Sequence, residues 1–254
     1  MLTRAASTLL LTLGLTMNLL GQARQTKVEP GAVAAKALAY FEQIEGRGLD
    51  EYLKSIRPPP LPPDLKAYVM ARLPRAPEVK PSASGRVKLA TLGPILNYHG
   101  RSSMYEFKVG RIGKAYVGLY ACAAVLISEE ALDLLTAEEL QAVIAHEMGH
   151  EYFWDEYQLS DQNKQYQTVQ ELELRCDGIA IITLSQLGLD PARLMSAVAK
   201  IRKFNERAGT LEERAYAYPS LDERMNFMRA MTELVGRVSN VMMRGYCQLN
   251  REIN

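Results

Sequence analysis

The chain has 254 residues, 48% of them hydrophobic, and a formal net charge of only +1 at pH 7. This length and apolar content are sufficient for one well-buried core with a small accessory segment. A nearly neutral chain gives no electrostatic reason to expect nucleic acid or an anionic membrane surface as a partner. The function is therefore expected to depend on particular side chains.

The N-terminus has the composition of an export signal. Residues 1–4 include one basic charge, residues 5–20 have no charge, and Gly21 and Ala23 place small residues before a possible cleavage site. This order is typical of a secretory signal peptide, residues 1–23, that is removed after Ala23. An uncleaved anchor is the alternative, because the apolar run approaches the ~20 residues that span a bilayer. Cleavage is favoured, which predicts an exported protein, periplasmic or secreted, with no stable transmembrane segment.

Export would place the three cysteines, Cys122, Cys176 and Cys247, in an oxidising compartment. An odd number allows at most one disulfide within a monomer, and the sequence leaves the pairing open. Cys176 is interpreted as a small buried apolar residue.

Residues 24–80 predict an N-terminal helical segment with a proline-rich linker. Apolar residues recur near the helical period between about residues 25 and 53, and five prolines in residues 58–63 exclude a helix there. Residues 64–73 predict another short helix. Residues 74–85, rich in proline, alanine and serine, are the predicted linker to the following domain.

The composition changes between residues 86 and 127. Short β-favouring runs at 87–92, 95–98, 104–109 and 115–120 are bounded by glycine and proline, and predict a small antiparallel sheet. Residues 116–124 are the candidate for the strand at the edge of a cleft, with an ordinary core strand as the alternative. His99, in a Tyr-His-Gly turn, is expected at the surface.

One stretch combines a helix start with candidate metal ligands. Thr136 and Glu139 form a capping box. His146 and His150 follow one helical turn apart, so their imidazoles can share one metal ion, and Glu147 beside them can hold a metal-bound water. A bare His-Glu-x-x-His pattern also occurs by chance on amphipathic helices with surface histidines. Two of only three histidines lie here among small uncharged residues, which favours the metal site.

A second apolar-periodic helix contains the candidate third ligand. Glu173 and Asp177 are one turn apart, and Glu173 can complete a His/His/Glu site that leaves a fourth position open, as in catalytic zinc sites. Asp177 is placed to accept the free ring N–H of a ligating histidine, with His146 as the preferred partner. Glu171 is the rival ligand, but helical spacing turns it away from Glu173. A charged, solvated helix face is the alternative for these carboxylates.

The remaining segments predict covering elements. The polar residues 151–170 are interpreted as a mobile loop over the cleft or a fraying continuation of the metal helix. Trp154 and Tyr157 are expected to fasten this segment, with stacking on substrate as the alternative. Residues 190–205 predict a core-packing helix. A last helix is predicted to start at Ser220, with Arg224 as a possible partner of an active-site carboxylate.

The motif around these ligands resembles a known family. Leu-Gln-Ala-Val-Ile-Ala-His146-Glu147-Met-Gly-His150, followed by Glu173-x-x-x-Asp177, is similar to the M48 (Ste24/HtpX-like) zinc metallopeptidases. The soluble periplasmic, BepA-like and Oma1-like members are the nearest analogues. The resemblance implies an α+β fold: a mainly helical zincin-type (gluzincin) metallopeptidase domain, residues 86–254, with a small antiparallel sheet before the metal helix. It also implies one Zn2+ per chain.

One position departs from the family pattern. Many members have His-Pro-Ser before the final helix, whereas this chain has Tyr218-Pro-Ser. A phenol could still donate a hydrogen bond to a developing oxyanion. Tyr218 is therefore kept as a candidate catalytic residue together with Glu147.

The resemblance predicts a zinc-dependent endopeptidase in which His146, His150 and Glu173 hold the metal and Glu147 activates a zinc-bound water. Asp177 and Arg224 are predicted to support the ligands. The expected substrates are polypeptides, in particular misfolded or mis-assembled exported proteins that pair as an extra strand with the cleft edge. The alternative is a zinc-binding envelope chaperone or assembly factor with little or latent proteolytic activity.

Overall fold

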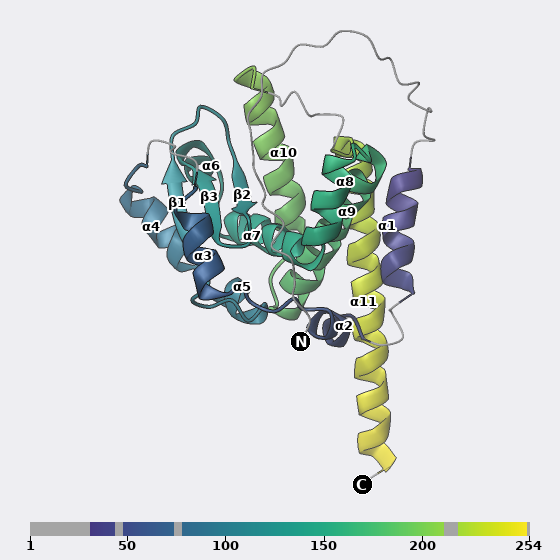
Figure 1. Ribbon diagram of the computed structural model, residues 1–254. Helices are drawn as coiled ribbons and strands as arrows, with labels where there is room; N and C mark the ends of the chain where they lie inside the picture. The colour runs from purple at the N-terminus through teal and green to yellow at the C-terminus, as the bar shows by residue number, and fades with distance from the viewer. Residues whose placement is uncertain (1–30, 44–47, 74–77, 211–217, 253–254) are drawn as a thin grey trace, which may run out of the picture.

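The computed structural model describes four stretches of the chain, residues 31–43, 48–73, 78–210 and 218–252 (Figure 1), with side chains described up to residue 238. The predicted signal peptide lies outside the described residues. In the part of the chain that is described, no helix is both long and apolar enough to cross a membrane.

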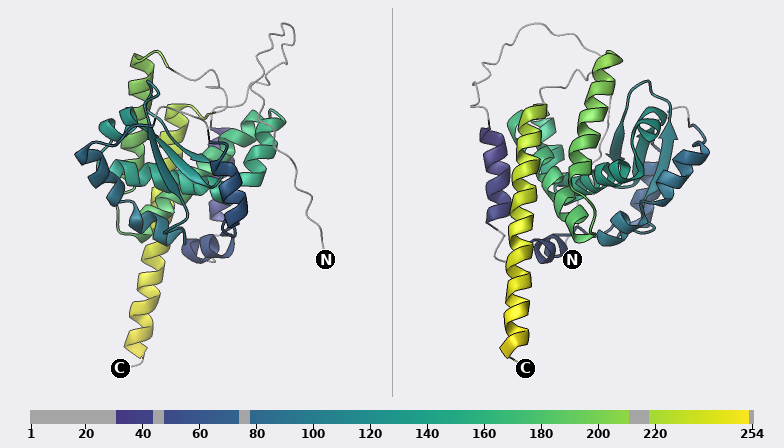
Figure 2. Two further views of the ribbon diagram at one scale, coloured as in Figure 1. Left: turned by 60° about the vertical axis from the view of Figure 1, so that its left-hand side comes forward. Right: turned by 180° about the vertical axis from the view of Figure 1, so that it is seen from behind.

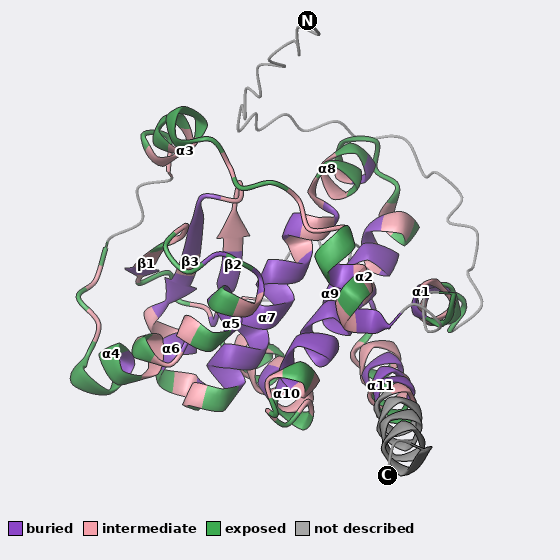
Figure 3. Cartoon of the chain, turned by 90° about the horizontal axis from the view of Figure 1, so that it is seen from below, coloured by how far each residue is buried: buried purple, intermediate pink, exposed green. Residues whose placement is uncertain are grey.

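Two buried helices form the centre of the fold. They are α7 (Ala137–Tyr152) and α9 (Tyr166–Gln186), which pack against each other (Figure 3). The capping box predicted at the start of α7 is present, with both of its reciprocal hydrogen bonds. The helices approach most closely where Gly149 meets Cys176: a Cβ on Gly149 would lie 2.8 Å from the Cα of Cys176. Only glycine permits this separation, so the two backbones come into contact.

A small sheet precedes α7, as the sequence predicts. Its strands are β1 (Glu106–Gly110), β2 (Val117–Tyr120) and β3 (Ala124–Ser128), in the order β1-β3-β2. The prediction of an antiparallel sheet is wrong: β3 pairs antiparallel with β2 but parallel with β1, so the sheet is mixed. The largely buried, apolar β3 takes the central position, which places its hairpin partner β2 at one edge and β1 at the other.

Two of the predicted strands are helices. Residues 87–92 and 95–98 fall largely in α4 (Ala83–Ala90) and α5 (Gly93–Tyr98). The Ser82 side chain caps α4 by accepting from the Gly85 N–H, and a proline occupies the first turn of α5. Short apolar runs do not distinguish a strand from one buried helical turn, and the flanking caps decide the outcome.

The polar residues 151–170 are also ordered into helices. The predicted loop is wrong, because these residues form α8 (Trp154–Gln162) and the start of α9. The helical path changes direction at Phe153, whose φ and ψ of −121° and 17° end α7. The high polarity of the segment reflects a surface helix that covers the cleft end of α7.

The other helices surround this centre. They are α1 (Ala32–Glu42), α2 (Leu49–Ser55), α3 (Pro63–Met70), α6 (Glu129–Leu134), α10 (Ala192–Arg207) and α11 (Leu221–Glu252). Helix α1 lies beside α11 and packs on α9 (Figure 2). Phe41 of α1 is fully buried against Gly178, so the N-terminal helices share the core of α7 and α9.

His99 is buried, which corrects the expectation of a surface residue. It is 1% exposed, with Nδ1 2.9 Å from the Tyr152 hydroxyl and Nε2 3.1 Å from Oγ1 of Thr183. Burial first, and then the charges of Arg57 and Arg101, lowers the pKa of His99 to about 3. A neutral imidazole therefore joins α5, α7 and α9.

Candidate metal centre

The two imidazoles of α7 converge on a carboxylate of α9. His146 Nε2 lies 3.5 Å from Oε2 of Glu173, and His150 Nε2 lies 3.8 Å from Oε1 of the same residue. Ligand atoms of a tetrahedral zinc ion, each 2.0–2.2 Å from the metal, are about 3.3–3.6 Å apart. The first distance fits this range, and the second would fit after a shift of a few tenths of an ångström. The two distances end on different oxygens of Glu173, so one carboxylate faces both imidazoles, and the three side chains have the chemistry of a ligand set for one divalent ion.

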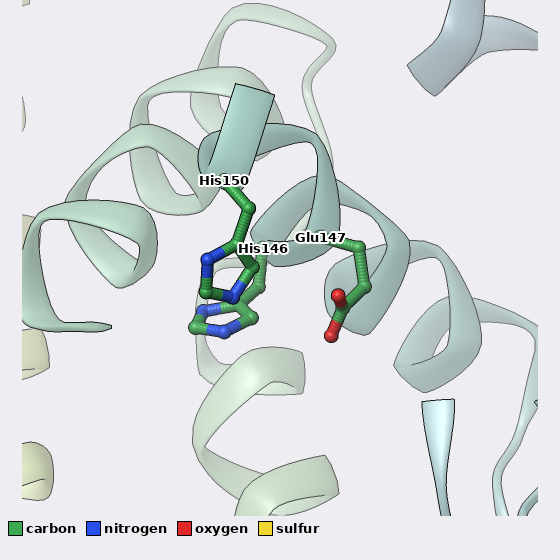
Figure 4. A group of neighbouring side chains, drawn as sticks. All are labelled: His146, Glu147 and His150. Atoms are coloured by element: carbon green, nitrogen blue, oxygen red, sulfur yellow. The ribbon is translucent and has the colours of Figure 1, made fainter. Parts of the chain in front are cut away.

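Glu147 lies close to the same point. His146, Glu147 and His150 each offer an atom within 4.8 Å of the others, and all three side chains extend from one side of α7 (Figure 4). The Glu147 carboxylate is held toward β2, because its Oε2 accepts a hydrogen bond of 2.8 Å from the Leu119 N–H. By contrast, Glu173 faces both imidazoles at once. The geometry thus favours Glu173 over Glu147 as a shared ligand.

The orientation of the His146 ring is fixed by the hydrogen bond of its Nδ1. Nδ1 lies 2.8 Å from Oδ1 of Asp177, so Nε2 is the nitrogen that faces Glu173. Asp177 has no exposed surface and also accepts two hydrogen bonds from Arg224 of α11, at 2.6 and 2.7 Å. Burial raises the pKa of Asp177, but the charges of Arg224 and His146 outweigh it, and the net pKa is lowered. An ionised Asp177 then accepts the His146 N–H.

Tyr157 contacts two of the candidate ligands, which the sequence did not predict. Its hydroxyl donates to Oε1 of Glu173 at 3.1 Å, and its ring centroid is 5.1 Å from that of His150. Tyr157 lies on α8, and its approach to α9 depends on the change of direction after α7. Its seven-residue distance from His150 is compatible with two helical turns, but that spacing alone does not place it beside Glu173.

The two carboxylates of the cleft have different protonation behaviour. Burial raises the pKa of Glu173, but the charges of His150 and His146 outweigh it, so the pKa falls to about 2. Burial dominates for Glu147 and raises its pKa. Glu173 thus favours the ionised form that a metal ligand requires, and Glu147 is better able to hold a proton.

The rival ligand Glu171 faces elsewhere. Its carboxylate forms ion pairs with Lys36 of α1 and with Arg175 one turn along α9. It is buried in these contacts, away from the imidazoles. Cys176 lies beside the imidazoles, with its Sγ 3.6 Å from His150 Nδ1. Cys176 and Cys122 are both free thiols. The side chain of Cys247 is outside the described part.

The candidate metal centre lies in a cleft of about 810 Å³. Its walls come from β2, from the helices α7 to α10 and from the start of α11. Residues 117–120 of the predicted edge segment form β2, at the edge of the sheet beside α7. Tyr218 lines the cleft with 39% of its surface exposed, and its carbonyl accepts a hydrogen bond from Gln170.

Residues 95–168 match the sequence model of peptidase family M48. This part of the chain is similar to the M48 peptidases. The match runs from α5 to the start of α9, so it includes the two histidines and Glu147 but ends before Glu173. No curated protein matches the chain. The M48 resemblance predicted from the motif is thereby confirmed over these residues, and it indicates a metallopeptidase that acts on polypeptides. The BepA-like and Oma1-like subtype stays a prediction.

Proposed function

We propose that this M48 chain is a zinc-dependent endopeptidase whose single Zn2+ is held by His146, His150 and Glu173. The observation that carries the proposal is the convergence of both Nε2 atoms on one carboxylate, at 3.5 and 3.8 Å, inside a cleft. When bound, zinc supplies Lewis-acid chemistry that acidifies water and polarises a peptide carbonyl.

Glu147 acts as the general base in this proposal. It takes a proton from the attacking water and delivers it to the amine of the leaving peptide. Its raised pKa supports this role, because a carboxylate that accepts a proton more readily is the better base near neutral pH. The hydrogen bond from Leu119 holds the carboxylate between β2 and the imidazoles.

Three further residues have supporting roles. Asp177 and Arg224 keep His146 in the tautomer and orientation that present Nε2 to the metal. Tyr218 donates a hydrogen bond to the oxyanion that develops on the substrate carbonyl, since it lines the cleft near the start of α11.

The proposed substrates are misfolded or mis-assembled exported proteins. An open strand edge recognises the backbone of an extended chain and is tolerant of its side chains, which suits unfolded polypeptides. Support for this substrate class comes from β2 at the edge of the sheet and, for export to the periplasm or medium, from the composition of the N-terminal residues.

Replacement of the general base tests the proposal. Glu147→Gln is expected to keep the fold and one zinc per chain but to cleave casein at least ~100-fold more slowly, the usual contribution of acid–base catalysis. Glu138→Gln, on the exposed first turn of α7, is the matched control and should cleave at the wild-type rate.

Three results would contradict the proposal. They are undiminished cleavage by Glu147→Gln, loss of zinc from that variant, and wild-type cleavage that survives complete removal of zinc by a chelator. A wild-type chain that holds zinc and prevents casein aggregation without cleaving it would instead support the chaperone alternative.

A further inference from the structure

The backbone of the β2 edge alternates between the sheet and the cleft. The Tyr116 carbonyl accepts the Ser128 N–H at 2.8 Å, so Tyr116 bonds toward β3. Leu119 instead donates its N–H to Glu147, across the cleft. In an antiparallel pair, successive residues turn their backbone groups to opposite sides. The N–H and C=O groups of Ala115, Val117 and Leu119 therefore face the cleft. Glu147 already accepts the Leu119 N–H, so a bound strand would pair with both groups of Val117 and with the Leu119 carbonyl.

At Ala115 these groups are already occupied. The Asn205 side chain, from α10, accepts the Ala115 N–H through Oδ1 at 2.8 Å and donates Nδ2–H to the Ala115 carbonyl at 2.9 Å. A carboxamide can accept and donate at once, so it reproduces the two-point contact of a neighbouring strand. The two residues are 90 positions apart in sequence, and α10 closes the strand edge at this end.

We propose that Asn205 is a specificity-determining residue that ends the substrate-pairing edge at Val117. The inference rests on the proposed peptidase function and specifies how that site binds its substrate. A substrate residue opposite Leu119 lies next to Glu147, and one opposite Val117 lies two residues farther along the substrate. The substrate residue two positions beyond the one opposite Val117 would have to pair with the backbone of Ala115. That backbone is already bonded to the Asn205 carboxamide.

The substrate consequently has to leave the strand edge after the residue that pairs with Val117. On this side of the cleft the wall is formed by α10, whose Val198 and Ile201 line it. Residues farther from the scissile bond add no backbone pairs there. The protein should thus bind only a short stretch of substrate backbone on one side of the scissile bond. A peptide elongated on that side beyond the residue opposite Val117 should not be cleaved faster.

Peptides of graded length test this inference. Two series share one cleaved sequence and are lengthened one residue at a time, either on the N-terminal or on the C-terminal side of the scissile bond. For the wild-type zinc form, kcat/KM in one series should stop rising about two residues from the scissile bond, because pairing positions alternate along a strand. In the same series, the Asn205→Ala variant should gain about a further tenfold in kcat/KM with the longer peptides, as expected for two added backbone hydrogen bonds.

The control is Lys203→Ala, an exposed position on the same helix, which should keep the wild-type length dependence. Affinities of the same peptides for Glu147→Gln, with and without Asn205→Ala, give a second reading that needs no turnover. A wild-type kcat/KM that rises steadily to six residues on both sides overturns the inference. The inference is also overturned if peptide affinities and cleavage rates depend on peptide length in the same way in the proteins with Asn205 and with Asn205→Ala. If no peptide is cleaved by zinc-loaded wild type, the peptidase proposal fails, whereas the affinity series still decides the role of Asn205.

Discussion

At His146 one hydrogen bond determines which ring nitrogen faces the candidate metal position. Asp177 takes Nδ1, and Arg224 in turn neutralises Asp177 through two hydrogen bonds. All three side chains lie in the interior or close to it, where an unpaired charge is costly. The orientation of this candidate ligand therefore depends on Arg224, a charged residue that does not face the candidate metal position.

Asp177→Asn tests this dependence. We expect zinc affinity to fall by about 10- to 100-fold, because the amide cannot accept the His146 N–H as strongly and leaves Arg224 without its counter-charge. The measurement is zinc competition against a chromogenic chelator. Glu171→Gln is the matched control, since it removes a buried carboxylate charge from the same helix but leaves the residues that face the imidazoles unchanged. Equal losses of affinity in the two variants would contradict a specific role for Asp177.

The crossing of α7 and α9 sets the distance between the imidazoles and Glu173. Gly149 lies between His146 and His150 in the last turns of α7 and contacts the backbone of Cys176, which lies on α9 three residues after Glu173. A larger residue at the crossing would separate the two helices at the position where the ligands meet. A glycine in the middle of this helix is thus explained by packing, despite its low helix propensity.

Gly149→Ala should weaken both the fold and the metal site. Its Cβ would lie 2.8 Å from the Cα and 2.9 Å from the Cβ of Cys176. Overpacking of this kind costs about 1–3 kcal/mol of unfolding free energy. Zinc affinity should fall as well, because the helices must move apart. Urea denaturation and zinc competition measure the two effects.

Gly236→Ala is the control for this change. Gly236 is exposed on α11, and an added Cβ would meet nothing within 4 Å, so the variant should gain about 0.5–1 kcal/mol from helix propensity. A Gly149→Ala protein with wild-type stability and zinc affinity would show that the helices tolerate a wider separation.

Over the whole molecule, a buried polar cluster joins the elements behind the cleft. His99 bridges α7 and α9 through Tyr152 and Thr183, and close by Arg101 pairs with Glu151 and donates to the Pro58 carbonyl. The cluster thus connects the proline-rich segment to the helix that carries the metal histidines. Its histidine is buried and neutral, which makes the stability of the fold dependent on pH.

The sign of this dependence follows from the lowered pKa. The folded chain keeps His99 neutral down to about pH 3, whereas the unfolded chain protonates histidine near pH 6.5. The stabilising contribution is thus fully present above pH 6.5 and is lost as the pH falls from there toward 3. The expected loss is at most about 1.4 kcal/mol per pH unit from this residue.

His99→Gln should make the unfolding free energy less dependent on pH between about pH 6.5 and 4. The variant is expected to be less stable than wild type at pH 7.5, because the contacts to Tyr152 and Thr183 are weakened, but the difference should shrink as the pH falls toward 4. Urea denaturation at a series of pH values gives both unfolding free energies. Parallel profiles for the two proteins would show that His99 is not the group that titrates on unfolding.

Much of the site is readable from short-range patterns. The capping box at Thr136, the one-turn spacing of the histidines and the equal spacing of Glu173 and Asp177 are properties of a single helix, so they do not depend on distant residues. The M48 resemblance depends on the same residues. The errors fall elsewhere: in the short apolar runs before β1, in the parallel pairing of β1 with β3, in the polar residues that form α8, and in the surface position expected for His99. Local caps decided the helices α4 and α5, whereas contacts with distant elements decided the position of α8 and the burial of His99.

The amino-acid sequence alone determined which residue types are presented together on each helix, because helical periodicity repeats over a few residues. Only the tertiary structure decided that Glu173 faces both imidazoles, that Tyr157 reaches it from α8, and that Asn205 occupies the strand edge at Ala115. These contacts require particular faces of separate elements to meet. Which faces meet depends on the packing of the whole core, including the backbone contact at Gly149, and no local pattern specifies that.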